Sequence, residues 1–222
     1  MKKNMLCLLL VVSLLTSCIV KKDYINRVVK EGEITSSKSK SVVLTGFDNI
    51  DLNSFKKTFA KNYPTNNEFI EAYISEFITE SKKSGIYGNY KVEFDDKWKE
   101  LDKGINADRA IVDELFSNAN ADYVITFSNF EITNRIETSY RAPISNSPAA
   151  TGTHDSKEYC VLDVEVSIYD TQTKKRVLKF VTTGESSVFL FNFSQTLLKA
   201  KKRSIQHIIN YIKSGRITYN KY

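Results

Sequence analysis

Histidine, glycine and proline are scarce in this sequence, which contains two, eight and three of them in 222 residues. So few glycines leave few places for a phosphate-binding loop, and neither that motif nor a Gly-x-Ser-x-Gly nucleophile turn is present. The surroundings of His154 offer no set of ligands at metal-site spacing. The sequence therefore predicts no cofactor, no metal site and no enzymatic activity. We expect His207 to be a partly buried structural residue of the last helix.

Long apolar runs are also scarce, and the most pronounced apolar run lies at the N-terminus. Met5 to Leu15 is almost wholly apolar and follows Lys2 and Lys3; even extended from Leu6 to Val20, the run holds 15 residues. A helix that spans a membrane needs about 20. A basic start followed by a short apolar run is typical of a secretory signal peptide, which we expect over residues 1–17.

The apolar run ends in Leu15-Thr16-Ser17-Cys18, which resembles the lipobox of bacterial lipoproteins. The resemblance implies cleavage before Cys18 and acylation (palmitate) of that cysteine, whereas an ordinary cleaved signal peptide is the alternative. Two or more acyl chains hold a protein stably on a membrane. Ile19 stands where an Asp, in some bacteria, retains a lipoprotein at the inner membrane. We therefore expect a lipid-anchored protein of the bacterial cell envelope, on the outer membrane.

Cysteine is scarce as well, with Cys7, Cys18 and Cys160 in the whole chain. Cys7 would leave with the signal peptide and Cys18 would carry lipid, so no intramolecular disulfide can form in the mature domain. Cys160 lies in an alternating apolar run, which predicts a buried small hydrophobic residue rather than a reactive thiol.

Charge is not concentrated enough to indicate a nucleic-acid partner. The formal net charge is +6, and the chain without Lys2 and Lys3 carries +4, from 30 basic and 26 acidic residues. This mild and scattered excess favours contact with anionic surfaces. Residues 18–40 are polar and poor in aromatic side chains. They predict a lipidated N-terminus followed by a flexible spacer that reaches about 25 Å.

Helical and alternating apolar patterns follow in residues 41–216, and a tail is expected over 217–222. Thr65-Asn66-Asn67-Glu68 has the form of a capping box for a helix that Gly85 would end. Residues 142–157 are expected to form an exposed loop. The patterns predict a strand at 41–45, a short helix or irregular segment at 51–63, the capped helix, a strand at 90–94, a helix at 107–118, strands at 122–132, 158–169 and 176–183, and a helix from about 194 to 214.

This order of elements predicts a single α/β or α+β sandwich over residues 41–216. We expect a mixed sheet of about five strands with three or so helices packed on it.

Three segments of this region resemble the domain shared by the curli-secretion lipoprotein and the lipoprotein activator of penicillin-binding proteins. They are Ala121-Asp122-Tyr123-Val124-Ile125 after a helix, the hairpin from Val164 to Val177, and Gly184 before a terminal amphipathic helix. The first strand departs from that family, because it ends in Thr45-Gly46-Phe47 in place of Pro-Phe. The resemblance covers roughly residues 41–213. It implies a binding or assembly role at the envelope, without catalysis.

Four basic residues of the last helix are candidate contacts for a partner or an anionic surface: Lys199, Lys201, Lys202 and Arg203. Leu197 and Leu198 set the buried face of this helix, so we expect the four to lie largely on its exposed side. A solvated helix face is the plainer interpretation. Contact with anionic lipid, polysaccharide or a protein is the functional one.

The leading hypothesis is a membrane-anchored, non-catalytic binding or assembly module for another envelope protein, with its oligomeric state left open. One alternative is an enzyme that modifies envelope polymers with carboxylates from separate strands. The visible pair, Asp95-Asp96, is more typical of a polar turn. The other alternative is a subunit of a lipoprotein secretion or assembly ring. Its candidate membrane strand, Ser186 to Phe193, is too short for a spanning hairpin.

Overall fold

The computed structural model describes residues 22–141, 153–216 and 219–220, which form a mixed α/β domain. The predicted signal peptide, the lipobox with Cys18 and most of the predicted C-terminal tail lie outside these residues. Within the described ranges, no helix is both long and apolar enough to cross a membrane.

The main sheet is mixed and has seven strands, so the predicted fold class is confirmed. Its strands are β2 (Ile25–Lys30), β3 (Ser37–Gly46), β4 (Ile50–Leu52), β5 (Tyr87–Val92), β6 (Tyr123–Arg141), β7 (Thr153–Asp170) and β8 (Lys175–Ser187). The order across the sheet is β2-β8-β7-β6-β3-β5, and β4 also pairs with β6. β3 runs parallel to both β5 and β6, whereas β6, β7, β8 and β2 are antiparallel neighbours. A separate short pair joins β1 (Lys22–Asp23) to β9 (Tyr219–Asn220).

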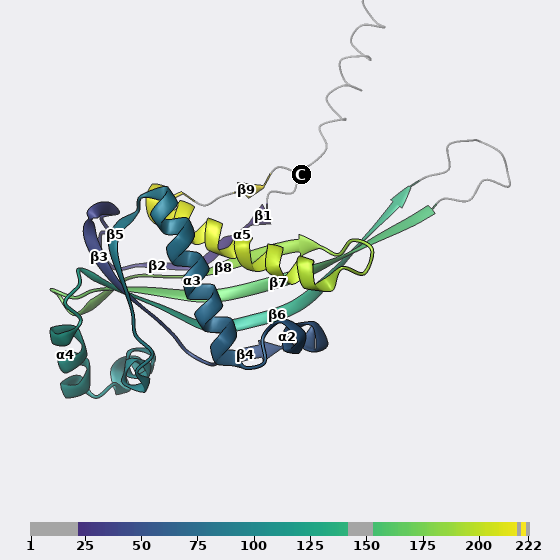
Figure 1. The fold of residues 1–222 in the computed structure, drawn as a ribbon. Helices are drawn as coiled ribbons and strands as arrows, with labels where there is room; N and C mark the ends of the chain where they lie inside the picture. The colour runs from purple at the N-terminus through teal and green to yellow at the C-terminus, as the bar shows by residue number, and fades with distance from the viewer. Residues whose placement is uncertain (1–21, 142–152, 217–218, 221–222) are drawn as a thin grey trace, which may run out of the picture.

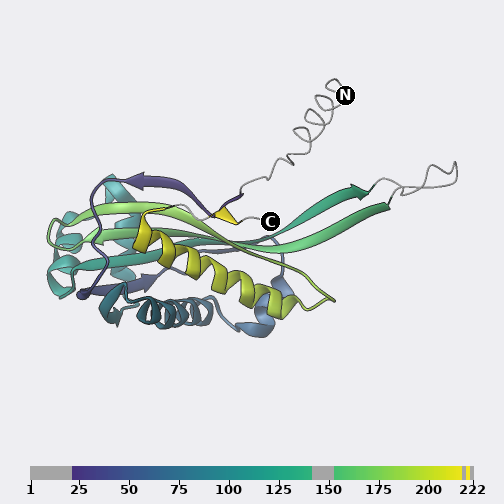
Figure 2. The ribbon, with the colours of Figure 1, turned by 90° about the horizontal axis from the view of Figure 1, so that it is seen from above.

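Helices cover the sheet unequally on its two faces (Figures 1 and 2). One face carries the two long helices α3 and α5, with the short α2 near the start of α5. The 3₁₀ segment η1 and α4 pack on the other face at one end of the sheet, where Trp98 and Val124 share a smaller buried cluster. These elements are α2 (Lys56–Asn62), α3 (Asn66–Ser84), η1 (Asp96–Asn106), α4 (Arg109–Asn118) and α5 (Phe193–Ser214).

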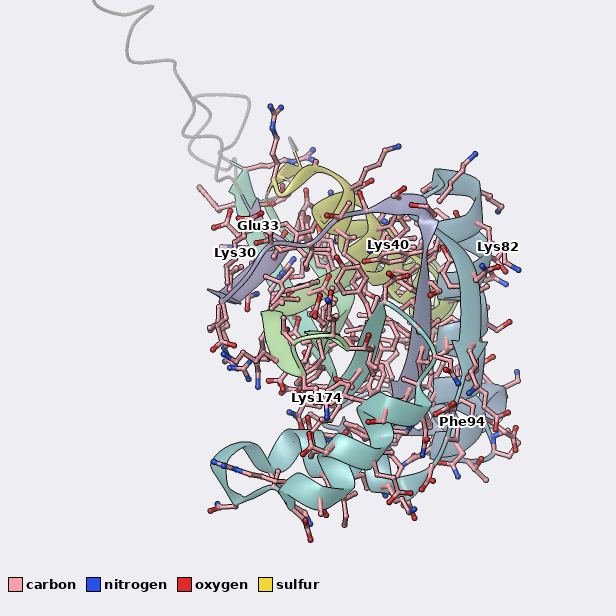
Figure 3. The ribbon with its side chains drawn as sticks, turned by 90° about the vertical axis from the view of Figure 1, so that its left-hand side faces the viewer. Lys30, Glu33, Lys40, Lys82, Phe94 and Lys174 are labelled. Atoms are coloured by element: carbon pink, nitrogen blue, oxygen red, sulfur yellow. The ribbon has the colours of Figure 1, made fainter. Side chains whose placement is uncertain are left out.

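An ion pair connects the turn between β7 and β8 to α4. Lys174 of this turn, which lies beside α4 in Figure 3, has its Nζ 2.8 Å from a carboxylate oxygen of Asp113. The predicted hairpin and the predicted helix over 107–118 therefore both form, and they meet at this end of the sheet.

Local sequence signals explain the position of α3. The Thr65 hydroxyl accepts the Glu68 amide at 3.2 Å, and Gly85 ends the helix with a φ of 66°. The helix predicted from the capping box is therefore confirmed. Its buried aromatic side chains meet β6, where the ring centroids of Tyr73 and Phe127 lie 5.5 Å apart.

β7 and β8 form the surface on which α5 packs. The alternation predicted for β7 is confirmed, because one face is fully buried beneath the helices: Cys160, Leu162, Val164, Val166 and Ile168. Burial raises the pKa of the Cys160 thiol to about 12, as expected for a structural residue. Gly184 of β8 allows α5 to approach closely, because a Cβ there would lie 2.1 Å from the Ala200 carbonyl oxygen.

The expectation of a flexible spacer up to residue 40 is wrong for the described part of that segment. β1 and β2 lie within residues 22–30, and Tyr24 and Ile25 are each 1% exposed. The Thr183 amide donates to the Tyr24 carbonyl at 2.8 Å, so this segment extends the sheet at the edge of β8. The domain therefore includes residues from 22 onward. The sequence pattern missed this because an edge strand needs few apolar residues when its backbone is paired.

The expected loop at 142–157 is also shorter than predicted. Residues 153–157 belong to β7 and pair with residues 137–141 of β6, and residues 142–152 lie outside the described part. The segment at 51–63 contains the end of β4 and the short helix α2.

Candidate interaction surface

β6 and β7 continue past the body of the domain as a two-stranded ribbon (Figures 1 and 2). We use this name for Ile136–Arg141 and Thr153–Glu158, which pair antiparallel throughout. β8 ends opposite Tyr159, and β4 ends opposite Ile132. In the part of the chain that the structure describes, no third strand pairs with either edge of the ribbon.

The two faces of the ribbon differ in character. Ile136 and Tyr140 continue the side of β6 that the helices cover further down, because alternate residues of a strand point to one side. They are 62% and 60% exposed. His154, which we expected in a loop, lies on the same face with its ring centroid 5.1 Å from that of Tyr140. The opposite face is charged, and Arg141 pairs with Asp155 there at 2.9 Å.

The chain turns between β8 and α5 through three exposed apolar residues, Phe189–Phe191, which we call the apolar turn. Their side chains are 72%, 78% and 85% exposed. The Val188 amide donates to the Glu158 carbonyl at 2.7 Å, so the turn lies at the base of the ribbon. The candidate membrane strand over Ser186–Phe193 does not form, because β8 ends and α5 begins inside that range.

A shallow hollow lies beside the apolar turn, between α2 and the start of α5. The rings of Phe55 and Phe193 meet edge to face there, with centroids 5.7 Å apart. The residues around the hollow come from α2 and its approach, the ribbon base and α5, and they include Phe55, Lys56, Lys57, Asn134, Glu158 and Phe193.

An ion pair between a half-buried arginine and a buried glutamate holds the base of the ribbon. Arg135 Nη1 lies 2.7 Å from Glu185 Oε2, and the Tyr24 hydroxyl donates to Glu185 Oε1 at 3.0 Å. The Arg203 guanidinium of α5 donates to the Glu185 carbonyl oxygen at 2.6 Å. The Arg135 guanidinium also lies 4.8 Å from the ring centroid of Tyr159. These contacts join the ribbon, β8, α5 and the N-terminal segment at one point.

His207 is a buried structural histidine, as the sequence predicts. Its Nδ1 lies 2.8 Å from the Thr183 carbonyl oxygen, and its ring stacks on Tyr24 with centroids 4.4 Å apart. Burial lowers the pKa of this imidazole. A neutral His207 that donates from Nδ1 therefore holds the N-terminal segment between β8 and α5.

The four basic residues predicted as contacts do not share one exposed face. Lys201 is 5% exposed, and its Nζ lies 3.0 Å from Glu76 Oε2 of α3. The expectation of exposure is wrong for Lys201 because it falls four residues after Leu197, on the buried stripe of α5. The other three are exposed: Lys199, Lys202 and Arg203.

The Asp95-Asp96 pair forms the polar turn that the sequence favoured. Asp95 accepts the Lys97 amide at 2.9 Å at the start of η1, and Asp96 pairs with Lys99 at 2.9 Å. Among the residues with described positions, no group of three or more His, Cys, Asp or Glu side chains is placed to hold a metal ion.

Ile136 and Tyr140 were not singled out from the sequence, and Phe189–Phe191 were considered only as part of the candidate membrane strand over Ser186–Phe193. A signal for an exposed apolar turn was present, since the run Val188–Phe191 follows the polar residues Glu185–Ser187 and is interrupted at Asn192. It was missed because an apolar cluster most often indicates a buried segment.

These features define a mixed α/β domain with a projecting β-ribbon and an exposed apolar turn. No protein-family model matches the chain, and no curated protein matches it. Among solved structures, the chain is similar to PelC from Paraburkholderia phytofirmans, which was solved as a dodecamer. The identity is 10% and the TM-score 0.42, over 88% of this chain and 100% of PelC.

Two further structures show a similar degree of likeness. One is a hypothetical protein from Chlamydia trachomatis, with 12% identity and a TM-score of 0.44 over 78% of this chain and 98% of that one. The other is a lipoprotein from Neisseria meningitidis, with 10% identity and a TM-score of 0.32 over 78% and 98% of the two chains. Likenesses of this size do not identify a function. The resemblance to the curli-secretion group stays a prediction.

Proposed function

We propose that this chain is a lipid-anchored envelope protein whose domain is a non-catalytic binding or assembly module, and that a protein partner binds at the ribbon. The ribbon itself is the observation that carries this proposal. Both of its edges lack a neighbouring strand among the described residues, and Ile136 and Tyr140 are exposed on one face. Unpaired N–H and C=O groups can accept an added strand, while alternate side chains supply specificity.

The base of the ribbon supports this role. An isolated two-stranded hairpin is marginally stable in water. Here the Arg135–Glu185 pair and the hydrogen bond from Val188 to Glu158 hold the hairpin where it leaves the sheet. A contact surface that is already ordered loses less conformational entropy when a partner binds.

The anchor part of the proposal depends on the lipobox-like sequence at Cys18. Because the domain includes Lys22, three residues (19–21) separate Cys18 from it. The four steps along the chain from Cys18 to Lys22 span at most about 14 Å. The module would therefore be held close to the membrane. Mass spectrometry of the mature N-terminus is expected to find an acylated Cys18, and an unmodified terminus elsewhere would contradict the anchor.

Site-specific photo-crosslinking tests the partner site. Benzoylphenylalanine replaces Tyr140 in the full chain, expressed in the bacterium that makes the protein. The matched control carries the same group at Phe94, which is 51% exposed and follows β5 (Figure 3). We expect an adduct with another envelope protein from position 140 and none from position 94. An adduct between two copies would favour the assembly-ring alternative, and no adduct from position 140 would count against the proposal.

A further inference from the structure

The apolar turn is a convex protrusion whose residues are the most exposed large apolar side chains in the described structure. Leu190 and Phe191 have φ values of 47° and 59°, a backbone region that residues with a side chain seldom adopt. This conformation presents three consecutive apolar side chains to the outside. Neighbouring exposed apolar groups of this kind mark a site of contact.

Hydrogen bonds within the turn satisfy part of its backbone. The Asn192 amide donates to the Phe189 carbonyl at 3.0 Å, and the Phe193 amide donates to the Phe191 carbonyl at 3.0 Å. The Asn192 side chain accepts the Gln195 amide at 3.3 Å at the start of α5. Removing backbone groups from water costs less free energy when they are already hydrogen-bonded.

Lysine side chains flank the turn. Lys56 and Lys57 are exposed beside the hollow that Phe193 lines. Lys199 is exposed on α5, about 9 Å along the helix from Phe193. Glu158 is the one carboxylate among the described residues that line the hollow, against two lysines, Lys56 and Lys57. The local net charge is therefore positive. Apolar side chains next to lysines suit the interface of a bilayer that contains anionic lipid.

The N-terminal segment enters the domain beside β8, the strand that leads into this turn. The Tyr24 carbonyl accepts the Thr183 amide, and six residues of β8 and its continuation lead from Thr183 to Phe189. An extended strand of that length covers about 20 Å. Cys18 itself has a reach of about 14 Å from Lys22 of β1. A lipid on Cys18 and the side chains of the apolar turn can therefore enter one bilayer.

We propose that the apolar turn inserts into the headgroup region of the bilayer that holds the N-terminal lipid. A bilayer accepts a convex apolar tip directly, whereas a protein partner would have to supply a groove of matching shape. The lysines add attraction to anionic headgroups, and the short link to Cys18 keeps the turn at the membrane. This contact is separate from the partner site on the ribbon and orients the ribbon relative to the membrane.

Tryptophan fluorescence tests the insertion. Leu190→Trp is made in the full lipidated chain, which is reconstituted into vesicles of phosphatidylethanolamine and phosphatidylglycerol with a spin label on the acyl chains. Trp98, the single tryptophan of the chain, is fully buried and gives a constant background. We expect the added emission to shift to shorter wavelength and to be quenched by the lipid label. Phe94→Trp is the matched control, and aqueous iodide rather than the lipid label should quench it.

A pair of lysine substitutions separates the contribution of positive charge to membrane insertion from that of the apolar side chains. Lys56→Gln with Lys57→Gln should reduce the lipid quenching of the Leu190→Trp protein in vesicles that contain phosphatidylglycerol, and leave it unchanged in phosphatidylcholine. Emission from position 190 that stays accessible to iodide in every vesicle would overturn the proposal. Protection that develops only after envelope extract is added would also overturn it, because the turn would then be a protein contact.

Discussion

The Arg135 guanidinium and the Glu185 carboxylate form an ion pair across β7, with Nη1 2.7 Å from Oε2. The Glu185 side chain is 1% exposed, whereas that of Arg135 is 31% exposed at the base of the ribbon. The pair joins the start of the ribbon to the strand that leads into the apolar turn. The pair therefore contributes to the geometry of both proposed contact regions.

Replacing Arg135 with methionine is expected to lower the free energy of unfolding by about 3 kcal/mol, because the buried Glu185 carboxylate loses the ion pair with Arg135. The hydrogen bond from the Tyr24 hydroxyl remains. Urea unfolding measures the change. The matched control is Arg141→Met, since the pair of Arg141 with Asp155 is exposed and should contribute less than about 1 kcal/mol. Equal stability of the two variants would contradict the structural role of Arg135.

The contact between Gly184 and α5 predicts a second stability effect. Gly184→Ala places a Cβ 2.1 Å from the Ala200 carbonyl oxygen and 2.5 Å from the Ser204 amide nitrogen, so the helix must shift. We expect a loss of about 2 kcal/mol or more, as for other overpacked sites. Thermal unfolding checks it, with Ser187→Ala at the exposed end of β8 as the control. An alanine variant as stable as the control would show that α5 does not pack this closely.

Much of the sheet and of the two long helices could be predicted because local signals and packing agree there. Thr65 and Gly85 mark the ends of α3, and the alternation along β7 is buried as the sequence indicates. The burial of Lys201 could also have been deduced, since its spacing from Leu197 places it on the apolar stripe. Its charge suggested exposure, but a carboxylate of α3 compensates that charge.

The candidate surface could not be predicted, because it depends on where strands stop pairing. Residue composition does not reveal that β8 ends opposite Tyr159 while β6 and β7 continue as a ribbon. The exposure of Phe189–Phe191 follows from the same ending, since a longer β8 would have carried these residues into the sheet. Edge pairing of β2 was hidden for a related reason: Val28 and Val29 remain 38% and 43% exposed even though their strand is ordered.

Lowering the pH is expected to weaken the attachment of the N-terminal segment through His207. Burial lowers the pKa of His207 below its ordinary 6.5, because the charged imidazolium loses water. Near and below pH 6.5 the unfolded chain therefore binds a proton that the folded chain does not. The stability that this residue contributes is present above that pH and is lost as the pH falls below it. The urea concentration at the midpoint of unfolding, measured at several pH values above and below 6.5, reports this loss of stability.

Two variants isolate the contribution of His207. His207→Asn keeps a side-chain donor for the Thr183 carbonyl but does not titrate in this range, so the decline of the urea midpoint below pH 6.5 should be smaller. His154→Gln removes the exposed histidine of the ribbon and should leave the decline in place. A decline that is unchanged by His207→Asn would assign it to other groups.

The apolar face of the ribbon, rather than its charged face, is expected to recognise the partner. Ile136→Ser with Tyr140→Ser should reduce recovery of the partner from gently solubilised membranes roughly thirtyfold, because an anchoring tyrosine contributes about 2 kcal/mol. Both side chains are exposed, so the free energy of unfolding should change by less than about 0.5 kcal/mol.

The matched control substitutes the opposite face, with Ser139→Ala and Arg141→Gln. Quantitative mass spectrometry of the co-purified proteins compares the two double variants with the unaltered chain. Because neither variant changes the N–H and C=O groups along the ribbon edges, the comparison separates side-chain recognition from strand addition alone. Equal recovery from both would mean that the edges bind without help from Ile136 and Tyr140, and the specificity assigned to this face would then be wrong.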